Sequence, residues 1–199
     1  MAENRVLLKL SKIVRVMTIA PLMAFVLINV LFFTNPASFG GLHNYLFAIL
    51  FLVVLPVLGY PLQPLIPKFK DKAREGQRNL AIIMAVIGYV CGIIYAFIVK
   101  APRVVWVIFV TYFLSGIGIV LFNKIVKVRA SGHACGVAGP MAVYIFTAGI
   151  RGIVSAAVLV LVFLSSIYMK RHTFRQLVYG SIIPIVCLGL ALLMTRPLI

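Results

Sequence analysis

The sequence predicts an all-α fold, a polytopic bundle of six to seven transmembrane helices in a single domain over residues 1–199. Hydrophobic residues make up 63% of the chain and charged residues only 11%, so the folded protein has to turn apolar surface toward lipid. The apolar runs are long enough to cross about 30 Å of hydrocarbon at about 1.5 Å per helical residue. Short polar breaks separate these runs, which favours helical hairpins over the alternating pattern of a membrane barrel.

The expected spans follow the apolar runs in order along the chain. They cover residues 17–33, 42–65, 80–99, 104–121, 134–150, 153–169 and 177–194. Proline and glycine interrupt helices, so "TNPASFGG" and "KAPR" are typical of short turns, whereas "PKFKDKAREGQRN" indicates a solvated loop. The N-terminal segment continues into the first span without a small-residue cleavage site, so we expect this span to stay in the mature protein.

Basic residues give the chain a formal net charge of +16 and predict its orientation. When loops alternate between two sides, 15 of the 19 basic residues share one side. They are four in the N-terminal segment, five after span 42–65, three before span 134–150 and three after span 153–169. The positive-inside rule makes this side cytoplasmic, and we expect a multi-pass protein of a prokaryotic plasma membrane. Because the charges lie at the ends of apolar runs, the expected partners are membrane lipids and an anionic substrate, and no nucleic acid.

Carboxylates are nearly absent, and this excludes several classes of enzyme. The only acidic residues are Glu3, Asp71 and Glu75, so residues 76–199 contain none. Enzymes that hold Mg²⁺ with clusters of aspartates, two-carboxylate hydrolases and Ser/His/Asp hydrolases all need acids that this chain lacks. The three cysteines show no CxxC spacing, so we expect no metal site, no disulfide framework and no cofactor.

Two polar stretches in this apolar chain, "VRASGHACG" (128–136) and "KRHTFRQ" (170–176), each contain one histidine. A phosphate group binds Lys and Arg side chains, backbone N–H groups of a small-residue turn, and the N-terminus of a helix. The run "KIVKVRASGHACG" supplies all three if a helix begins near Ala134. A histidine with an ordinary pKa of about 6.5 serves either as a nucleophile or as a general acid at neutral pH.

These stretches resemble motifs of the type 2 phosphatidic acid phosphatase (PAP2) superfamily of membrane lipid phosphatases. The motifs of that family are Lys-x6-Arg-Pro, Pro-Ser-Gly-His and Ser-Arg-x5-His-x3-Asp. Here "ASGH" (130–133) resembles the second motif and "SSIYMKRHTFRQ" (165–176) resembles the third. The resemblance covers residues 104–199 and implies a PAP2-like core there, with residues 1–103 as additional N-terminal spans.

Carried over by position, the resemblance implies a role for each site residue. His172 is the expected nucleophile that takes the phosphoryl group, and His133 is the expected acid that protonates the leaving oxygen. Ser131 and Gly132 are expected to bind phosphate through the hydroxyl and the backbone N–H. The basic residues expected to bind phosphate are Lys124, Lys127, Arg129 and Arg171.

The chain departs from the family pattern at three positions. Phe122 stands where the first motif has its lysine, and Ser166 stands where the third motif has its arginine. Gln176 replaces the acid that orients the nucleophile. A glutamine oxygen accepts from the imidazole N–H and fixes its tautomer, but it does not stabilise an imidazolium as a carboxylate does. We therefore expect Gln176 to orient His172, with Arg171 or Arg175 supplying the positive charge of the missing arginine.

The sequence thus favours an enzyme, a metal-independent phosphatase that hydrolyses a lipid phosphate monoester or a prenyl diphosphate through a phosphohistidine. The altered third motif leaves open a PAP2-like protein that binds lipid phosphates without turnover. A small transporter or a membrane scaffold, in which both stretches are ordinary interfacial charge, is the other alternative. Loss of phosphate release on replacing His133 and His172 would discriminate the first from the other two.

Overall fold

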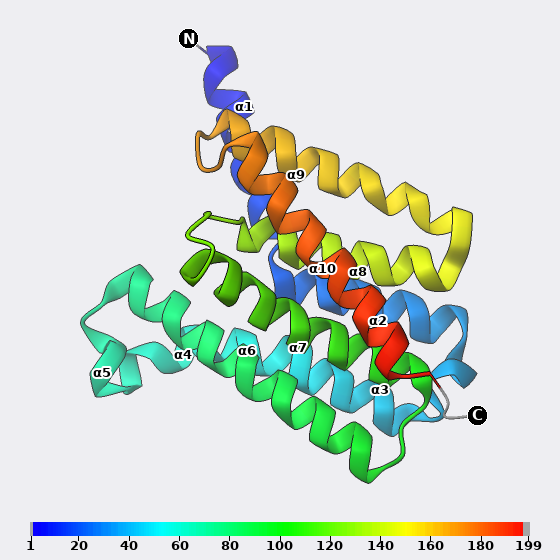
Figure 1. Cartoon of the computed structure of the whole chain (residues 1–199). Coiled ribbons are helices and arrows are strands. Elements are labelled where there is room, and N and C mark those ends of the chain that lie inside the picture. Colours follow the sequence, from blue (N-terminus) through cyan, green and yellow to red (C-terminus); the bar gives the residue numbers. More distant parts are fainter. Residues whose placement is uncertain (1, 197–199) are drawn as a thin grey trace. The chain divides into compact units, whose positions relative to one another are not determined.

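The computed structural model describes residues 2–196, which form helices joined by short turns (Figure 1). No strand lies within these residues, so the predicted all-α class is confirmed. The α-helices are α1 (Ala2–Met17), α2 (Ala20–Thr34), α3 (Leu42–Ile49), α4 (Leu55–Leu62), α5 (Pro67–Lys70), α6 (Ala73–Ile98), α7 (Arg103–Lys124), α8 (Gly132–Ala148), α9 (Ala156–Tyr168) and α10 (Phe174–Met194).

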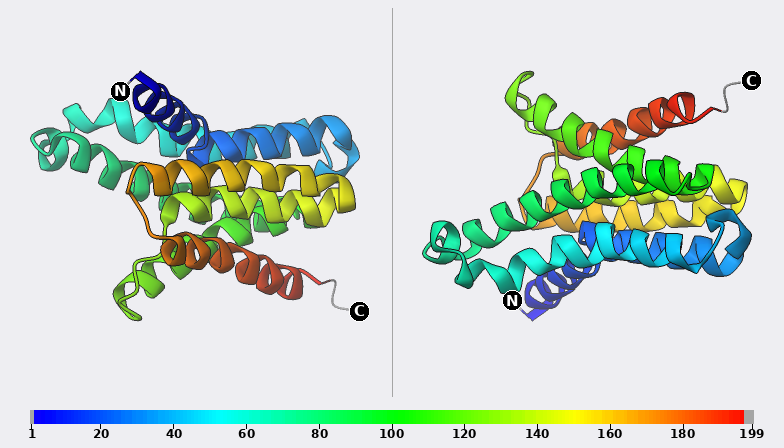
Figure 2. Two further views of the ribbon diagram at one scale, coloured as in Figure 1. Left: turned by 90° about the horizontal axis from the view of Figure 1, so that it is seen from above. Right: turned by 90° about the horizontal axis from the view of Figure 1, so that it is seen from below.

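Five helical segments among the described residues are long and apolar enough to cross a membrane: Leu42–Leu65, Ala73–Ile98, Arg103–Lys124, Gly132–Tyr168 and Phe174–Met194. The segments Arg5–Met17 and Ala20–Thr34, bent by 60°, make a sixth if they form one broken span. Each of the seven predicted spans falls on a helix, although spans 134–150 and 153–169 both lie within Gly132–Tyr168. In that segment the turn Gly149–Ser155 separates α8 from α9, and Figure 2 shows the two helices side by side.

Two polar regions are more helical than the sequence predicts. The residues 2–17 form α1, and the region expected as a solvated loop contains α5 and the first two turns of α6, which begins at Ala73. Polar composition correctly indicates exposure here, since most side chains of residues 67–79 are exposed. It does not argue against a helix, because Lys, Arg, Glu and Gln all have good helix propensity.

The chain divides into two compact units, one formed by residues 1–23 and 114–199 and the other by residues 24–113. In the second unit, α6 packs closely against the chain from α3 to α4. A Cβ on Gly59 would lie 2.6 Å from the Ala81 Cα, and a Cβ on Gly88 would overlap the Phe51 carbonyl oxygen. Small residues let membrane helices approach at these points.

In the first unit, α8 packs against α10, and α1 packs against α9. Ile182, Val186 and Leu193 on α10 are exposed, whereas Gly180 and Ala191 on its opposite face are buried. Large apolar side chains that face outward and small ones that face inward are typical of a helix surrounded by lipid on one side. The unit therefore holds both polar stretches on helices that contact each other.

Replacing Gly180 by alanine is expected to destabilise the protein, because the added methyl group would overlap the Ser131 carbonyl oxygen. We expect a loss of about 1–3 kcal/mol in the free energy of unfolding, measured by denaturant unfolding in detergent. Gly189→Ala on the same helix is the matched control, since a Cβ there meets nothing within 4 Å. Equal stability of the two variants would contradict the close contact between α8 and α10.

Candidate active site

His133 lies in the first turn of α8, directly after a well-formed helix start. Ser131 is the N-cap, and its side-chain oxygen accepts from the Ala134 N–H at 3.2 Å. The Ser131 N–H donates to the Gln176 carbonyl oxygen at 2.9 Å, which ties the start of α8 to the first turn of α10. Serine is a preferred N-cap because its oxygen satisfies one of the otherwise unpaired N–H groups of the first turn.

The N-terminus of α8 is open where the sequence predicts phosphate. Gly132 is exposed, and a Cβ built on it meets nothing within 4 Å. Ser131, by contrast, is fully buried, and its hydroxyl oxygen is occupied by the cap. Its expected contribution to phosphate binding is therefore indirect, through the placement of the Gly132 and His133 N–H groups.

His172 lies in the turn that leads from α9 into α10. Thr173 is the N-cap of α10, and Gln176 completes a capping box in which its Oε1 accepts from the Thr173 N–H at 3.3 Å. The same Oε1 lies 3.2 Å from His172 Nδ1. An amide oxygen only accepts hydrogen bonds, so Nδ1 carries the proton of the neutral ring and Nε2 keeps a free lone pair. Gln176 thus lies beside the histidine that it is expected to orient.

Burial lowers the pKa of His172 from its ordinary value of 6.5. The positive charges of Arg129, Arg15 and Arg171 lower it further, while the hydrogen bond to Gln176 acts in the opposite direction. Like charges and burial both disfavour the imidazolium. His172 is therefore neutral at pH 7, the state in which Nε2 is nucleophilic.

The structure brings the two polar stretches together in one site. The charge of His172 acts on His133, and the charge of Arg15 acts on both histidines. Packing of α8 against α10 places one histidine at the start of each helix. The main-chain bond from Ser131 to Gln176 thus joins the starts of the two helices that carry the histidines.

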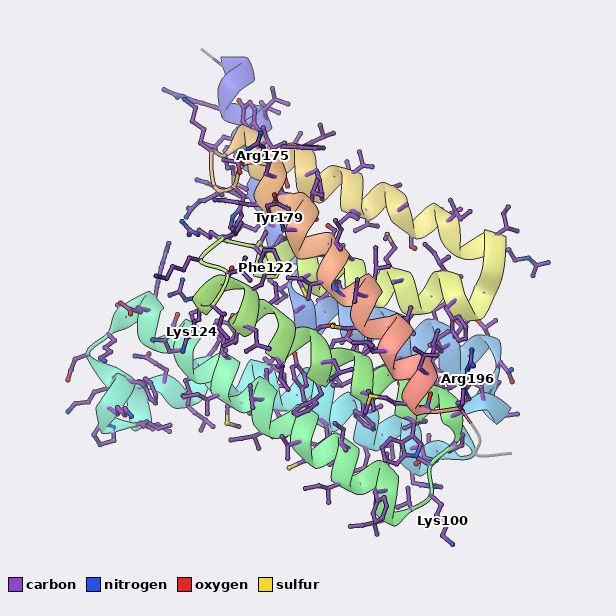
Figure 3. The ribbon with its side chains drawn as sticks, in the orientation of Figure 1. Lys100, Phe122, Lys124, Arg175, Tyr179 and Arg196 are labelled. Atoms are coloured by element: carbon purple, nitrogen blue, oxygen red, sulfur yellow. The ribbon has the colours of Figure 1, made fainter. Side chains whose placement is uncertain are left out.

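The segment that connects α7 to α8 carries three of the expected phosphate ligands. Asn123 holds its end in place, since its Oδ1 accepts from the Ala130 N–H at 2.6 Å. Arg129 is exposed and is one of the charges that act on His172. Lys124 ends α7, two residues after Phe122, whose ring centroid lies 5.5 Å from that of Tyr179 on α10 (Figure 3), and Lys127 lies in the turn. Both lysines are exposed, and their contact with phosphate stays a prediction.

Sequence reasoning missed Arg15 and Thr18, which α1 brings to the site. Thr18 Oγ1 lies 3.0 Å from His133 Nε2. By its position in the sequence, Arg15 is only one of the basic residues that predict orientation. A usable signal was present, because Ser11, Arg15 and Thr18 recur at helical spacing on a different face from Arg5, Lys9 and Lys12.

The pH dependence of turnover should report the lowered pKa of His172. Because the neutral form persists to lower pH, we expect the acidic limb of kcat/KM to lie below pH 6.5. Arg129→Gln removes a charge that opposes protonation, so the limb should move to higher pH. Gln176→Leu removes a hydrogen bond that favours protonation, so the limb should move to lower pH. Lys9→Gln, remote on α1, is the control, and shifts of the wrong sign would contradict the assignment.

Among residues 2–196, no group of three or more His, Cys, Asp or Glu side chains gathers in an arrangement that could hold a metal ion. Comparisons with protein-family models, with curated proteins and with solved structures find no match to the chain. Functional assignment therefore depends on the geometry of the site.

Proposed function

We propose that the protein is a metal-independent phosphatase that hydrolyses a lipid phosphate monoester or a prenyl diphosphate through a phosphohistidine. The observation that carries the proposal is the pairing of His172, whose Nε2 is free, with His133 at the N-terminus of α8. Arg15, Arg129 and Arg171 surround His172 with positive charge. This donor set suits a phosphate and lacks the carboxylates that other hydrolases use.

The reaction proceeds in two balanced steps. In the first, the lone pair of His172 Nε2 attacks phosphorus, a P–N bond forms and the ester P–O bond breaks. The departing oxygen takes a proton from the His133 imidazolium, which the negative charge of the bound phosphate stabilises. In the second step, water attacks phosphorus and gives a proton to His133, the P–N bond breaks, and inorganic phosphate is released.

The lipid character of the substrate follows from where the site lies. His133 and His172 are at the ends of helices whose outward faces are apolar and exposed, as on α10. An apolar tail can remain between lipids while the phosphate reaches the basic end of the unit. Inward-facing small residues set the shape that selects among lipid tails.

The test is phosphate release by the detergent-purified protein in the presence of EDTA. The panel holds phosphatidic acid, phosphatidylglycerol phosphate and short prenyl diphosphates, with His43→Ala as a control, since His43 is exposed in the second unit. Release that survives EDTA is the expected result. Activity that EDTA abolishes would contradict the mechanism.

A binding protein without turnover is the second candidate, favoured by one observation. The partner of His172 Nδ1 is the neutral amide of Gln176 and not a carboxylate, so the imidazolium of a phosphohistidine gains less stabilisation. Binding of short-chain phosphatidic acid by a folded protein that releases no phosphate and forms no acid-labile phosphoprotein would support this candidate.

The excess of basic residues supports a cytoplasmic orientation of the site as part of this proposal. Lys127 precedes α8 and Arg151 follows it, and both are exposed. In a cysteine-free background, a membrane-impermeant maleimide applied to intact cells should label Arg151→Cys and not Lys127→Cys. The reverse pattern would place the site on the outer face.

A further inference from the structure

We propose that Arg15 is a direct ligand of the phosphate and that Thr18 positions His133, so that the N-terminal helix α1 completes the site. The inference rests on the proposed function, because it assigns a phosphate to the space between the two histidines. Arg15 and Thr18 lie at the end of α1, one turn apart, where the chain bends by 60° into α2.

Arg15 carries a buried donor that the described residues leave unpaired. Its Nη1 is enclosed and has no hydrogen-bond partner within residues 2–196. An arginine stays charged at all ordinary pH values, and an unpaired buried donor of a charged group is costly. The atom is therefore expected to meet an acceptor that the chain itself does not supply.

The first unit contains almost no carboxylate that could fill this role. Asp71 and Glu75 belong to the second unit, which leaves Glu3 as the only acidic side chain of the first. Glu3 precedes Arg15 by twelve residues on α1, about 18 Å along the helix axis. Within the described part of the first unit, no acidic side chain is positioned to pair with Arg15, which suits a bound anion as its counter-charge.

Other positive groups converge on the same place. The charge of Arg15 acts on His133 and His172, and it interacts with that of Arg171. Arg129 also acts on His172. Like charges at one site repel one another, and an anion bound between them offsets this repulsion. A tetrahedral oxyanion offers oxygens to several donors at once.

Arg15 differs from the other cations of α1, which are ordinary surface charges. Arg5, Lys9 and Lys12 are exposed, whereas Arg15 is half-buried on the face that includes the buried Ser11. Its helix packs against α9, where Ser166 is also buried. Positive-inside anchoring accounts for the exposed residues but not for an enclosed guanidinium.

Thr18 fixes the orientation of His133. Its hydroxyl donates to the Val14 carbonyl oxygen at 2.7 Å, so its oxygen is left to accept from His133 Nε2–H at 3.0 Å. This contact leaves Nδ1 as the nitrogen that carries the proton for the leaving oxygen. The bend between α1 and α2 packs closely against α8, since a Cβ on Gly136 of α8 would lie 2.7 Å from the Ala20 Cβ at the start of α2.

The experiment measures binding of orthovanadate, a phosphate mimic, to the detergent-purified full chain by calorimetry. Arg15→Gln is expected to weaken binding about 10- to 100-fold, and Arg15→Lys to recover part of the loss. Lys12→Gln, three residues away and exposed, is the matched control and should change binding less than about twofold. Thermal unfolding of each variant shows that it is folded.

The outcomes separate this inference from the proposed function. Wild-type protein that neither binds vanadate nor releases phosphate would overturn the proposed function and this inference with it. Wild-type binding that Arg15→Gln leaves unchanged would overturn the role of Arg15 alone. Inorganic phosphate and short-chain phosphatidic acid, compared as competitors of vanadate, distinguish a free anion from a lipid headgroup.

The positioning role of Thr18 has its own readout. Thr18→Val is expected to lower kcat about tenfold with little change in KM, and Thr18→Ser, which keeps the hydroxyl, should restore kcat. The loss should be smaller for p-nitrophenyl phosphate, whose leaving group needs no proton. Equal loss of kcat with both substrates would overturn the link to His133.

Discussion

Replacing His172 by alanine is expected to lower the rate of phosphate release by about 10⁴-fold or more. The imidazole is the group whose Nε2 lone pair is free, because its Nδ1–H is directed at the Gln176 amide oxygen. Single-turnover kinetics quenched with alkaline detergent should show an acid-labile, base-stable phosphoprotein in the wild type and none in His172→Ala.

The controls for this prediction test whether the loss is chemical. His172→Ala should still bind vanadate, because the α8 N-terminus and the arginines remain. His43→Ala removes an exposed histidine from the second unit and should leave the rate unchanged. A phosphoprotein that persists in His172→Ala would assign the nucleophile elsewhere.

Replacing His133 by alanine is expected to lower turnover of alkyl lipid phosphates by about 10²- to 10⁴-fold. His133 supplies a proton to an alkoxide, which is a poor leaving group. A p-nitrophenolate leaves without protonation, so His133→Ala should lose much less activity on p-nitrophenyl phosphate. The ratio of the two rates is the measurement, and an unchanged ratio would mean that His133 only binds.

Much of the fold could be predicted from the sequence because lipid imposes a simple rule. A backbone within hydrocarbon has to satisfy its own hydrogen bonds, so each apolar run becomes a helix. The ends of helices follow side-chain chemistry instead. The sequence places the start of one span at Ala134, whereas α8 begins at Gly132 because Ser131 caps it. Likewise the polar start of α6 at Ala73 lies outside the hydropathy pattern.

The residues of the candidate site also fall into those that local sequence predicts and those that it does not. His133, His172 and Gln176 are marked by local spacing, and Gln176 Oε1 lies beside His172 Nδ1 because both belong to one turn of the chain. Helical spacing sets Arg15 and Thr18 on their own face of α1, but it does not say what that face contacts, because its packing beside His133 is a long-range contact. Basic residues are abundant at this end, so charge alone did not distinguish the enclosed Arg15 from the exposed Lys124.

The hydrogen bond from the Ser131 N–H to the Gln176 carbonyl oxygen has a consequence for motion. It links, through the main chain, the residue two before His133 to the residue that orients His172. A displacement of α10 that keeps this bond also displaces the start of α8, so His133 and His172 are expected to move together. Movement that admits a substrate is therefore expected of α1, whose hydrogen bond to His133 is made by the Thr18 side chain.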